Sequence, residues 1–177
     1  MCIRDSASRA GFDVKGVARR ILNGGKTPVE VADASYSVII VGGGAAGVAV
    51  AASLLARSPQ LDIAIIDPAT VHYYQPGWTM VGAGVFEAST TARTMASVLP
   101  RGVHWLQSAV AAFEPERNAV ILDGCRVVRY EQLVVCPGLK LDWHGVEGLV
   151  DTLGRNGVTS NYRYDLAPYT LSLIHIS

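Results

Sequence analysis

The 177-residue sequence is 50% hydrophobic and 17% charged and contains 18 glycines, which excludes a disordered chain and favours an α/β domain with buried strands. Lysine plus arginine and aspartate plus glutamate each total 15, so the formal net charge is zero and no basic surface for nucleic acid is expected. No apolar run approaches the roughly 20 residues that a membrane-spanning helix needs.

Both ends of the chain are expected to be sequencing-adapter scars. Residues 1–6 are MCIRDS and residues 171–177 are LSLIHIS, and one short DNA sequence read in opposite senses encodes both. That DNA resembles the transposase-end adapter used in preparing sequencing libraries, so both ends are excluded from the fold. Residues 7–35 are compatible with a presequence, a flexible leader or translated upstream DNA, and no function is assigned to them.

A strand, a helix and a second strand are predicted between Tyr36 and Asp67. Residues 37–41 are a short β-branched run, which is typical of a parallel strand buried on both faces. After the glycine-rich GGGAAG comes an alanine-rich helix ending at Arg57, and residues 61–66 form the second strand. These elements make a complete βαβ unit.

The pattern changes after this unit. Residues 69–85 carry little periodicity and are predicted to form an ordered loop, and residues 90–99 a short helix. Short β-prone runs separated by turn residues then predict an antiparallel meander between residues 103 and 128. Its strands are expected at residues 103–106, 109–113, 119–122 and 126–128, with a last buried strand at 133–136.

The motif Gly42-x-Gly44-x-x-Gly47 lies where the first strand meets the helix, the context in which it binds dinucleotides. The glycines allow a tight turn, a close approach to the pyrophosphate, and close packing of helix on strand. The phosphates are expected at the helix N-terminus, where the backbone N–H groups of residues such as Ala45 and Ala46 are available. Asp67, twenty residues after Gly47, is the expected acceptor for the ribose hydroxyls.

FAD rather than NAD is indicated by the meander and by residues 130–138, YEQLVVCPG. This stretch resembles the second FAD signature of the glutathione-reductase-like superfamily, in which Gly138 lies near the flavin and Cys136 replaces the usual alanine. Val110 falls where such proteins bind adenine through the backbone of a valine. The expected fold is therefore a partial Rossmann-like FAD-binding domain with a β-meander insertion, over residues 36–170.

Residues 72–84, HYYQPGWTMVGAG, resemble sulfide:quinone oxidoreductases of the type II, mitochondrial-like branch. The resemblance extends over about residues 36–170, roughly the first third of such an enzyme. It implies a membrane-associated parent enzyme that oxidises sulfide at a cysteine pair and passes electrons through FAD to quinone. Gln75 lies in the loop expected beside FAD. The redox cysteines of that branch lie beyond Thr170, so no catalytic residue is assigned and this segment alone is expected to be inactive.

The two cysteines outside the predicted scars, Cys125 and Cys136, match no zinc or CxxC spacing, and no metal ligand is predicted. Cys136, at the end of a predicted buried strand, is expected to be an inert thiol. The CxxxxC pair of disulfide reductases is missing after the second strand, which excludes that subgroup. An alternative remains open: an FAD-binding module of another flavoprotein, such as a type 2 NADH dehydrogenase, a flavocytochrome subunit or a non-catalytic FAD-dependent protein.

Overall fold

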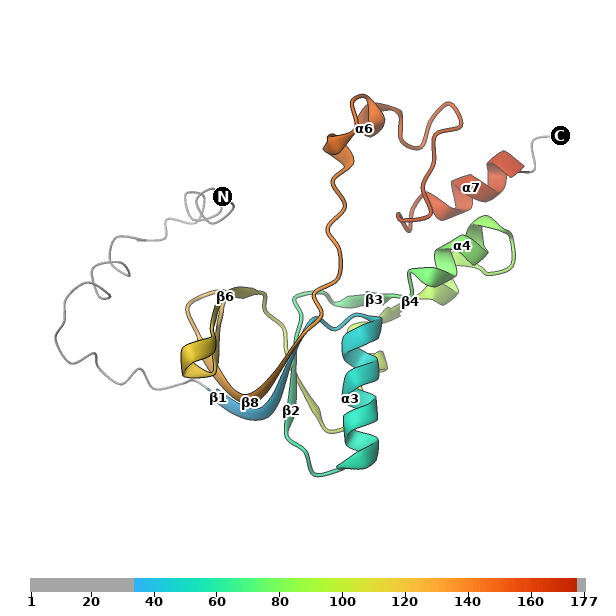
Figure 1. Ribbon diagram of the computed structural model, residues 1–177. Helices are drawn as coiled ribbons and strands as arrows, with labels where there is room; N and C mark the ends of the chain where they lie inside the picture. Colours follow the sequence, from blue (N-terminus) through green and yellow to red (C-terminus); the bar gives the residue numbers. More distant parts are fainter. Residues whose placement is uncertain (1–33, 175–177) are drawn as a thin grey trace. The chain divides into compact units, whose positions relative to one another are not determined.

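The computed structural model describes residues 34–174, and its main sheet has six strands (Figure 1). The predicted scar at 1–6, nearly all of the stretch 7–35, and residues 175–177 lie outside the described residues. The strand order is β5-β2-β1-β8-β7-β6, and β5, β2, β1 and β8 are parallel. The strands are β1 (Ala34–Val41), β2 (Ile63–Ile66), β5 (Val103–Leu106), β6 (Val110–Glu114), β7 (Ala119–Leu122) and β8 (Val127–Val135).

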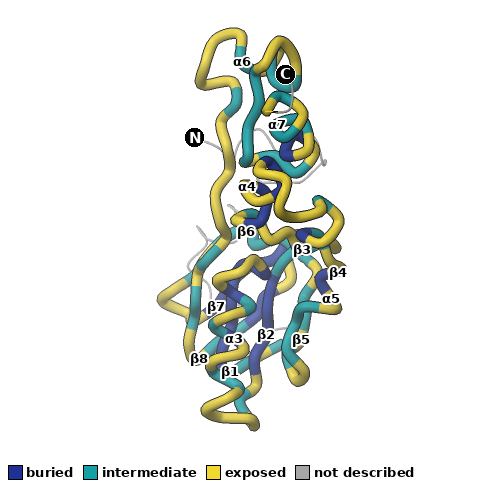
Figure 2. Tube along the Cα trace, turned by 90° about the vertical axis from the view of Figure 1, so that its right-hand side faces the viewer, coloured by how far each residue is buried: buried dark blue, intermediate teal, exposed yellow. Residues whose placement is uncertain are grey.

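The predicted βαβ unit is present as β1, helix α3 (Ala45–Arg57) and β2. Alternate residues of β1 enter two different cores, because successive side chains of a strand point to opposite faces. Ile40 packs with Ala51 of α3, whereas Ile39 packs with Val120 of β7 on the other face. Figure 2 shows the buried residues gathered in β1 and β2. Both strands are thus buried on two faces, which explains their continuous apolar sequences.

The meander is smaller than predicted. It consists of β6, β7 and the first part of β8, which pair antiparallel. The prediction that residues 103–106 belong to it is wrong, because β5 pairs parallel with β2 at the edge of the main sheet. The predicted strands at 126–128 and 133–136 are one strand, β8, which pairs with β1 over most of its length. The exposed Glu131 and Gln132 interrupt its apolar pattern and hide this continuity in the sequence.

Residues 69–85 contain regular structure, which corrects the predicted loop. They hold strand β3 (Val71–Tyr73) and helix α4 (Pro76–Gly82). The single helix predicted at 90–99 is also wrong, since three short elements lie there and the second pairs antiparallel with β3. These elements are η1 (Ala88–Thr91), β4 (Ala92–Thr94) and α5 (Met95–Val98). Three-residue strands and a seven-residue helix are too short to show a hydrophobic period.

The remaining elements are η2 (Pro115–Arg117), η3 (Trp143–Gly145), α6 (Leu149–Thr152) and α7 (Ala167–Ile174). Helix α7 packs against α4, where Ala167 meets Trp78 and Val81 in a small buried cluster. It continues past residue 170, the predicted domain boundary, and the interpretation of residues 171–177 as a scar stays a prediction. None of the helices in the described part of the chain is long and apolar enough to cross a membrane.

Candidate functional site

The turn after β1 is built so that only glycine fits at its first position. Gly42 has φ +104°, and a Cβ atom there would lie 2.2 Å from the carbonyl oxygen of Cys136. The close approach is fixed by two backbone hydrogen bonds, from Gly42 N–H to the carbonyl of Ile66 (2.9 Å) and from Cys136 N–H to that of Val41 (2.8 Å). The chain therefore turns sharply at the carboxyl edge of the sheet.

The other two glycines of the motif have different surroundings. A Cβ atom on Gly47 would lie 1.9 Å from the carbonyl oxygen of Gly42, so Gly47 lets α3 pack directly on the turn. A Cβ atom on Gly44, the N-cap of α3, would meet nothing within 4 Å. Gly44, Ala45 and Ala46 are all exposed. The N-terminus of α3 thus opens onto free space, as binding of a phosphate group requires.

Hydrogen bonds hold both the carboxylate and the backbone carbonyl of Asp67 in place. Its Oδ2 accepts from Gly43 N–H at 2.6 Å and its Oδ1 from Ala69 N–H at 2.8 Å. The indole N–H of Trp105, on β5, donates to its backbone carbonyl at 2.9 Å. A carboxylate offers about four acceptor positions, and the bonds from Gly43 and Ala69 occupy two of them. Asp67 can therefore hold the glycine turn and still accept hydrogen bonds from two hydroxyl groups.

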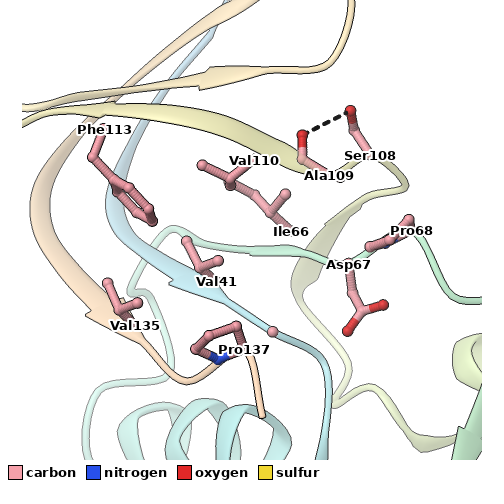
Figure 3. A pocket seen from close by; sticks show the side chains of 11 residues that line it. Val41, Ile66, Asp67, Pro68, Ser108, Ala109, Val110, Phe113, Val135 and Pro137 are labelled. Carbon is pink, nitrogen blue, oxygen red and sulfur yellow. Dashed lines mark hydrogen bonds between the residues drawn. The ribbon is translucent and has the colours of Figure 1, made fainter. Parts of the chain in front are cut away.

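A cavity of about 290 Å³ opens at the carboxyl ends of β1, β2 and β8 (Figure 3). Gly42 and Asp67 line it together with Val110, at the start of β6. Its walls are largely apolar and include the half-exposed side chains of Phe113 and Val135. A cavity with apolar walls and a carboxylate suits a nucleoside, whose flat base needs the walls and whose ribose needs the acceptor.

A second cavity, of about 610 Å³, is lined by Gln75 and Gly138, which lie far apart in the sequence. Pro137 lines both cavities, so the two are neighbours. The amide nitrogen of Gln75 lies 3.5 Å from the carbonyl oxygen of Asn161, which ties the loop before α4 to the segment before α7. The structure thus brings Gly42, Asp67 and Val110 to one cavity and Gln75 and Gly138 to the next, with the N-terminus of α3 directly after Gly42.

Sequence reasoning missed several residues of the second cavity. Trp78 packs against Tyr73, with ring centroids 5.8 Å apart, and both side chains also line this cavity. The indole nitrogen of Trp78 is buried and has no hydrogen-bond partner in residues 34–174. Tyr162, 55% exposed, is another lining residue. The available signal was the cluster of aromatic residues at 72–78.

The two cysteines among residues 34–174 do not form a pair. Cys136 is half-buried at the end of β8, its Sγ lies 3.8 Å from the carbonyl oxygen of Gly42, and burial raises the pKa of its thiol. Cys125 is exposed in the turn before β8. A raised pKa keeps Cys136 in the neutral, unreactive form. Within the described residues, no three His, Cys, Asp or Glu side chains gather as a metal site would require.

A protein-family model described as pyridine nucleotide-disulphide oxidoreductase matches residues 36–169. The chain belongs to this family. The predicted fold class is confirmed, because proteins of this family have the Rossmann-like domain found here. FAD is the cofactor of this domain.

Two relatives within the pyridine nucleotide-disulphide oxidoreductase family are mitochondrial sulfide:quinone oxidoreductases. That of Dictyostelium discoideum is 42% identical over 138 residues, covering 77% of this chain and 30% of the relative. That of Mus musculus is 37% identical over 127 residues, covering 72% and 28%. The crystal structure of the Aquifex aeolicus sulfide:quinone oxidoreductase matches with a TM-score of 0.63 and 24% identity, over 77% of this chain and 31% of that one. The chain spans about 30% of the length of these relatives.

Proposed function

We propose that the chain forms the FAD-binding part of a flavoenzyme that oxidises sulfide and passes the electrons to a quinone drawn from a membrane. The fold and family support the cofactor, and the two mitochondrial relatives support the reaction. The cofactor proposal rests on one observation: two adjoining cavities and the open N-terminus of α3 lie beside one another at one edge of the sheet. Ligands of open α/β sheets bind at this carboxyl edge.

The residues present fit each part of FAD. The adenosine is assigned to the first cavity, where Val110 would lie beside the base and Asp67 would accept hydrogen bonds from the ribose hydroxyls. The diphosphate is assigned to the N–H groups of Gly44, Ala45 and Ala46, at the positive end of the α3 dipole.

The flavin ring is assigned to the second cavity. Its larger volume and its aromatic and apolar walls, including Tyr73 and Trp78, suit a tricyclic ring. Gln75 supplies an amide there that can donate or accept a hydrogen bond, and Gly138 leaves room for the ring. When bound, FAD supplies a two-electron acceptor, and the role of these residues is to orient its ring and exclude water from it.

The cofactor proposal is tested by titrating the purified 177-residue chain with FAD, with FMN as the comparison. FMN lacks the adenosine that the first cavity is proposed to hold, so FAD is expected to bind at least tenfold more tightly. Equal affinities for FAD and FMN would contradict the assignment of the first cavity.

The reaction is tested in a chimaera, because the chain spans only part of its relatives. The matching 138 residues of the Dictyostelium enzyme are replaced by their counterparts from this chain. Sulfide-dependent quinone reduction, abolished by removing FAD, is the expected result. The same chimaera carrying Asp67→Ala serves as the control for cofactor loss. A folded, FAD-loaded chimaera that reduces quinone with NADH and not with sulfide would instead favour another flavoprotein of the family.

A further inference from the structure

Gly43, the middle residue of the glycine turn, is held from two directions. Its N–H donates to Asp67 Oδ2 at 2.6 Å, and its carbonyl oxygen lies 3.1 Å from Nδ1 of His72, on β3. A carbonyl oxygen can only accept, so this hydrogen bond requires the hydrogen of the imidazole to be on Nδ1. The histidine lies on β3, whereas the aspartate follows β2.

This contact fixes the direction of a neighbouring N–H group. The peptide unit that joins Gly43 to Gly44 is planar and trans, so its carbonyl and its N–H point in opposite directions. His72 draws the carbonyl toward itself, and the N–H of Gly44 must then point away from the imidazole. Gly44 is exposed and has open space around its Cα atom.

The contact with His72 restrains a part of the turn that the hydrogen bonds of Gly42 N–H and Gly43 N–H do not hold directly, the peptide between Gly43 and Gly44. Gly42, Gly43 and Gly44 can each adopt backbone conformations that other residues avoid. The peptide between Gly43 and Gly44 could therefore rotate. The backbone of His72 is itself fixed, because it pairs with Arg93 across β3 and β4, and Tyr74 N–H donates to the carbonyl of Thr91 at 2.8 Å. A strand held by backbone hydrogen bonds thus restrains the peptide after Gly43.

We propose that His72 is a positioning residue for diphosphate binding: its Nδ1–H holds the Gly43 carbonyl so that the Gly44 N–H is directed at the phosphate before the ligand arrives. This inference rests on the proposed FAD site. Its physical basis is preorganisation, since a donor that is already aligned does not lose conformational freedom on binding.

The test compares three substitutions in the 177-residue chain. His72→Asn places its amide nitrogen the same number of bonds from Cα as Nδ1, whereas His72→Gln places it one bond farther out, and His72→Ala has no donor. ADP and adenosine are the probes, measured by calorimetry, because they share the base and ribose and differ in the diphosphate. His72→Ala and His72→Gln are expected to weaken ADP binding roughly tenfold, the effect of one lost hydrogen bond. His72→Asn should stay within about threefold of wild type, and adenosine affinity should not change.

Loss of ADP and adenosine affinity together would overturn the proposal, because it would mean that His72 supports the whole domain and not the phosphate donor. Wild-type ADP affinity in His72→Gln would overturn it too. If His72→Ala fails to fold, the comparison of His72→Asn with His72→Gln still decides. A wild-type chain that binds neither ADP nor FAD would refute the proposed function itself, an outcome separate from any difference among the variants.

Discussion

Asp67 shows how one side chain serves both the fold and the ligand. The bond from Gly43 N–H stabilises the turn, while the free acceptor positions of the carboxylate are left for hydroxyl groups. Its place could be predicted from the sequence, since it follows a buried strand at the usual distance from the glycine motif. Gln75 could be predicted only to lie near the cofactor, because its contact with Asn161 joins residues 86 positions apart. Trp78 and Tyr162 were missed for the same reason.

Replacing Asp67 with alanine should weaken FAD binding by about 1.5–3 kcal/mol, the range for lost hydrogen bonds to a charged group. Asp67→Asn is the matched control, because its amide oxygen can still accept from Gly43 N–H while the charge is lost. Its amide nitrogen cannot accept from Ala69 N–H, so the asparagine variant should melt between the wild type and the alanine variant and still bind FAD more weakly than the wild type. The measurement is a fluorescence titration with FAD together with a thermal melt, and unchanged FAD affinity in both variants would remove Asp67 from the site.

Cys136 should react slowly with thiol reagents. Burial raises the pKa of its thiol, so at pH 8 a smaller fraction is thiolate than in an ordinary cysteine, and the thiolate is the reacting form. Cys125 is exposed and should be alkylated by iodoacetamide first. The experiment follows alkylation by mass spectrometry in a Cys2→Ser background. Faster modification of Cys136 than of Cys125 would show that Cys136 is activated, contrary to its half-buried position.

At the scale of elements, the sequence predicts best where a continuous apolar run or an alanine-rich stretch coincides with a buried element. Strand β1, helix α3 and strand β2 were predicted because apolar runs and an alanine-rich helix flank a recognisable turn. Residues 103–106 are correctly predicted to form a strand, but the predicted meander is the wrong place for it, because β5 pairs with β2. Local patterns do not reveal which strand is the partner. Strand β3 and helix α4 are not predicted from the sequence, yet β3 carries His72 and α4 begins directly after Gln75.

Alanine substitutions of Gly47 and Gly44, at the start of α3, should affect the stability of the domain and FAD binding differently. Gly47→Ala places a Cβ atom 1.9 Å from a backbone oxygen, so it should destabilise the domain by roughly 3 kcal/mol even though alanine favours helices by about 1 kcal/mol. Gly44→Ala meets no protein atom and has φ −70°, which alanine accepts. Its cost in stability should stay below about 1 kcal/mol.

FAD affinity should be affected more by Gly44→Ala than by Gly47→Ala. The methyl group of Gly44→Ala projects into the space assigned to the diphosphate, so FAD affinity should fall about tenfold, or about 1.4 kcal/mol. Urea unfolding and FAD titration of both variants give the two quantities. A Gly44→Ala variant that unfolds easily and still binds FAD normally would contradict this division of roles.

For the whole domain, the parallel strands explain why residues from distant parts of the chain form one site. The carboxyl ends of β1, β2 and β8 meet at the edge where the first cavity opens, so the turns after these strands converge there. This convergence could be predicted from the βαβ pattern. The second cavity could not, because it depends on the loop before α4 and on the segment around Tyr162.

The last prediction concerns turnover. Sulfide oxidation of the proposed kind needs two cysteines close enough to form a disulfide, with Cα atoms less than about 7 Å apart. Cys125 precedes the nine-residue strand β8 and Cys136 follows it, which at about 3.3 Å per residue separates them by roughly 30 Å along the strand. The structure also stabilises the neutral thiol of Cys136.

The FAD-loaded 177-residue chain should therefore show no sulfide-dependent quinone reduction above that of free FAD, since loss of a nucleophile costs several orders of magnitude in rate. Cys136→Ser should leave that background unchanged, whereas in the Dictyostelium chimaera the same substitution should leave full activity. The measurement is the absorbance of a soluble quinone with and without sulfide under anaerobic conditions. Turnover by the chain alone that disappears in Cys136→Ser would make Cys136 a catalytic nucleophile, because the substitution removes a single sulfur atom from an otherwise intact cofactor site.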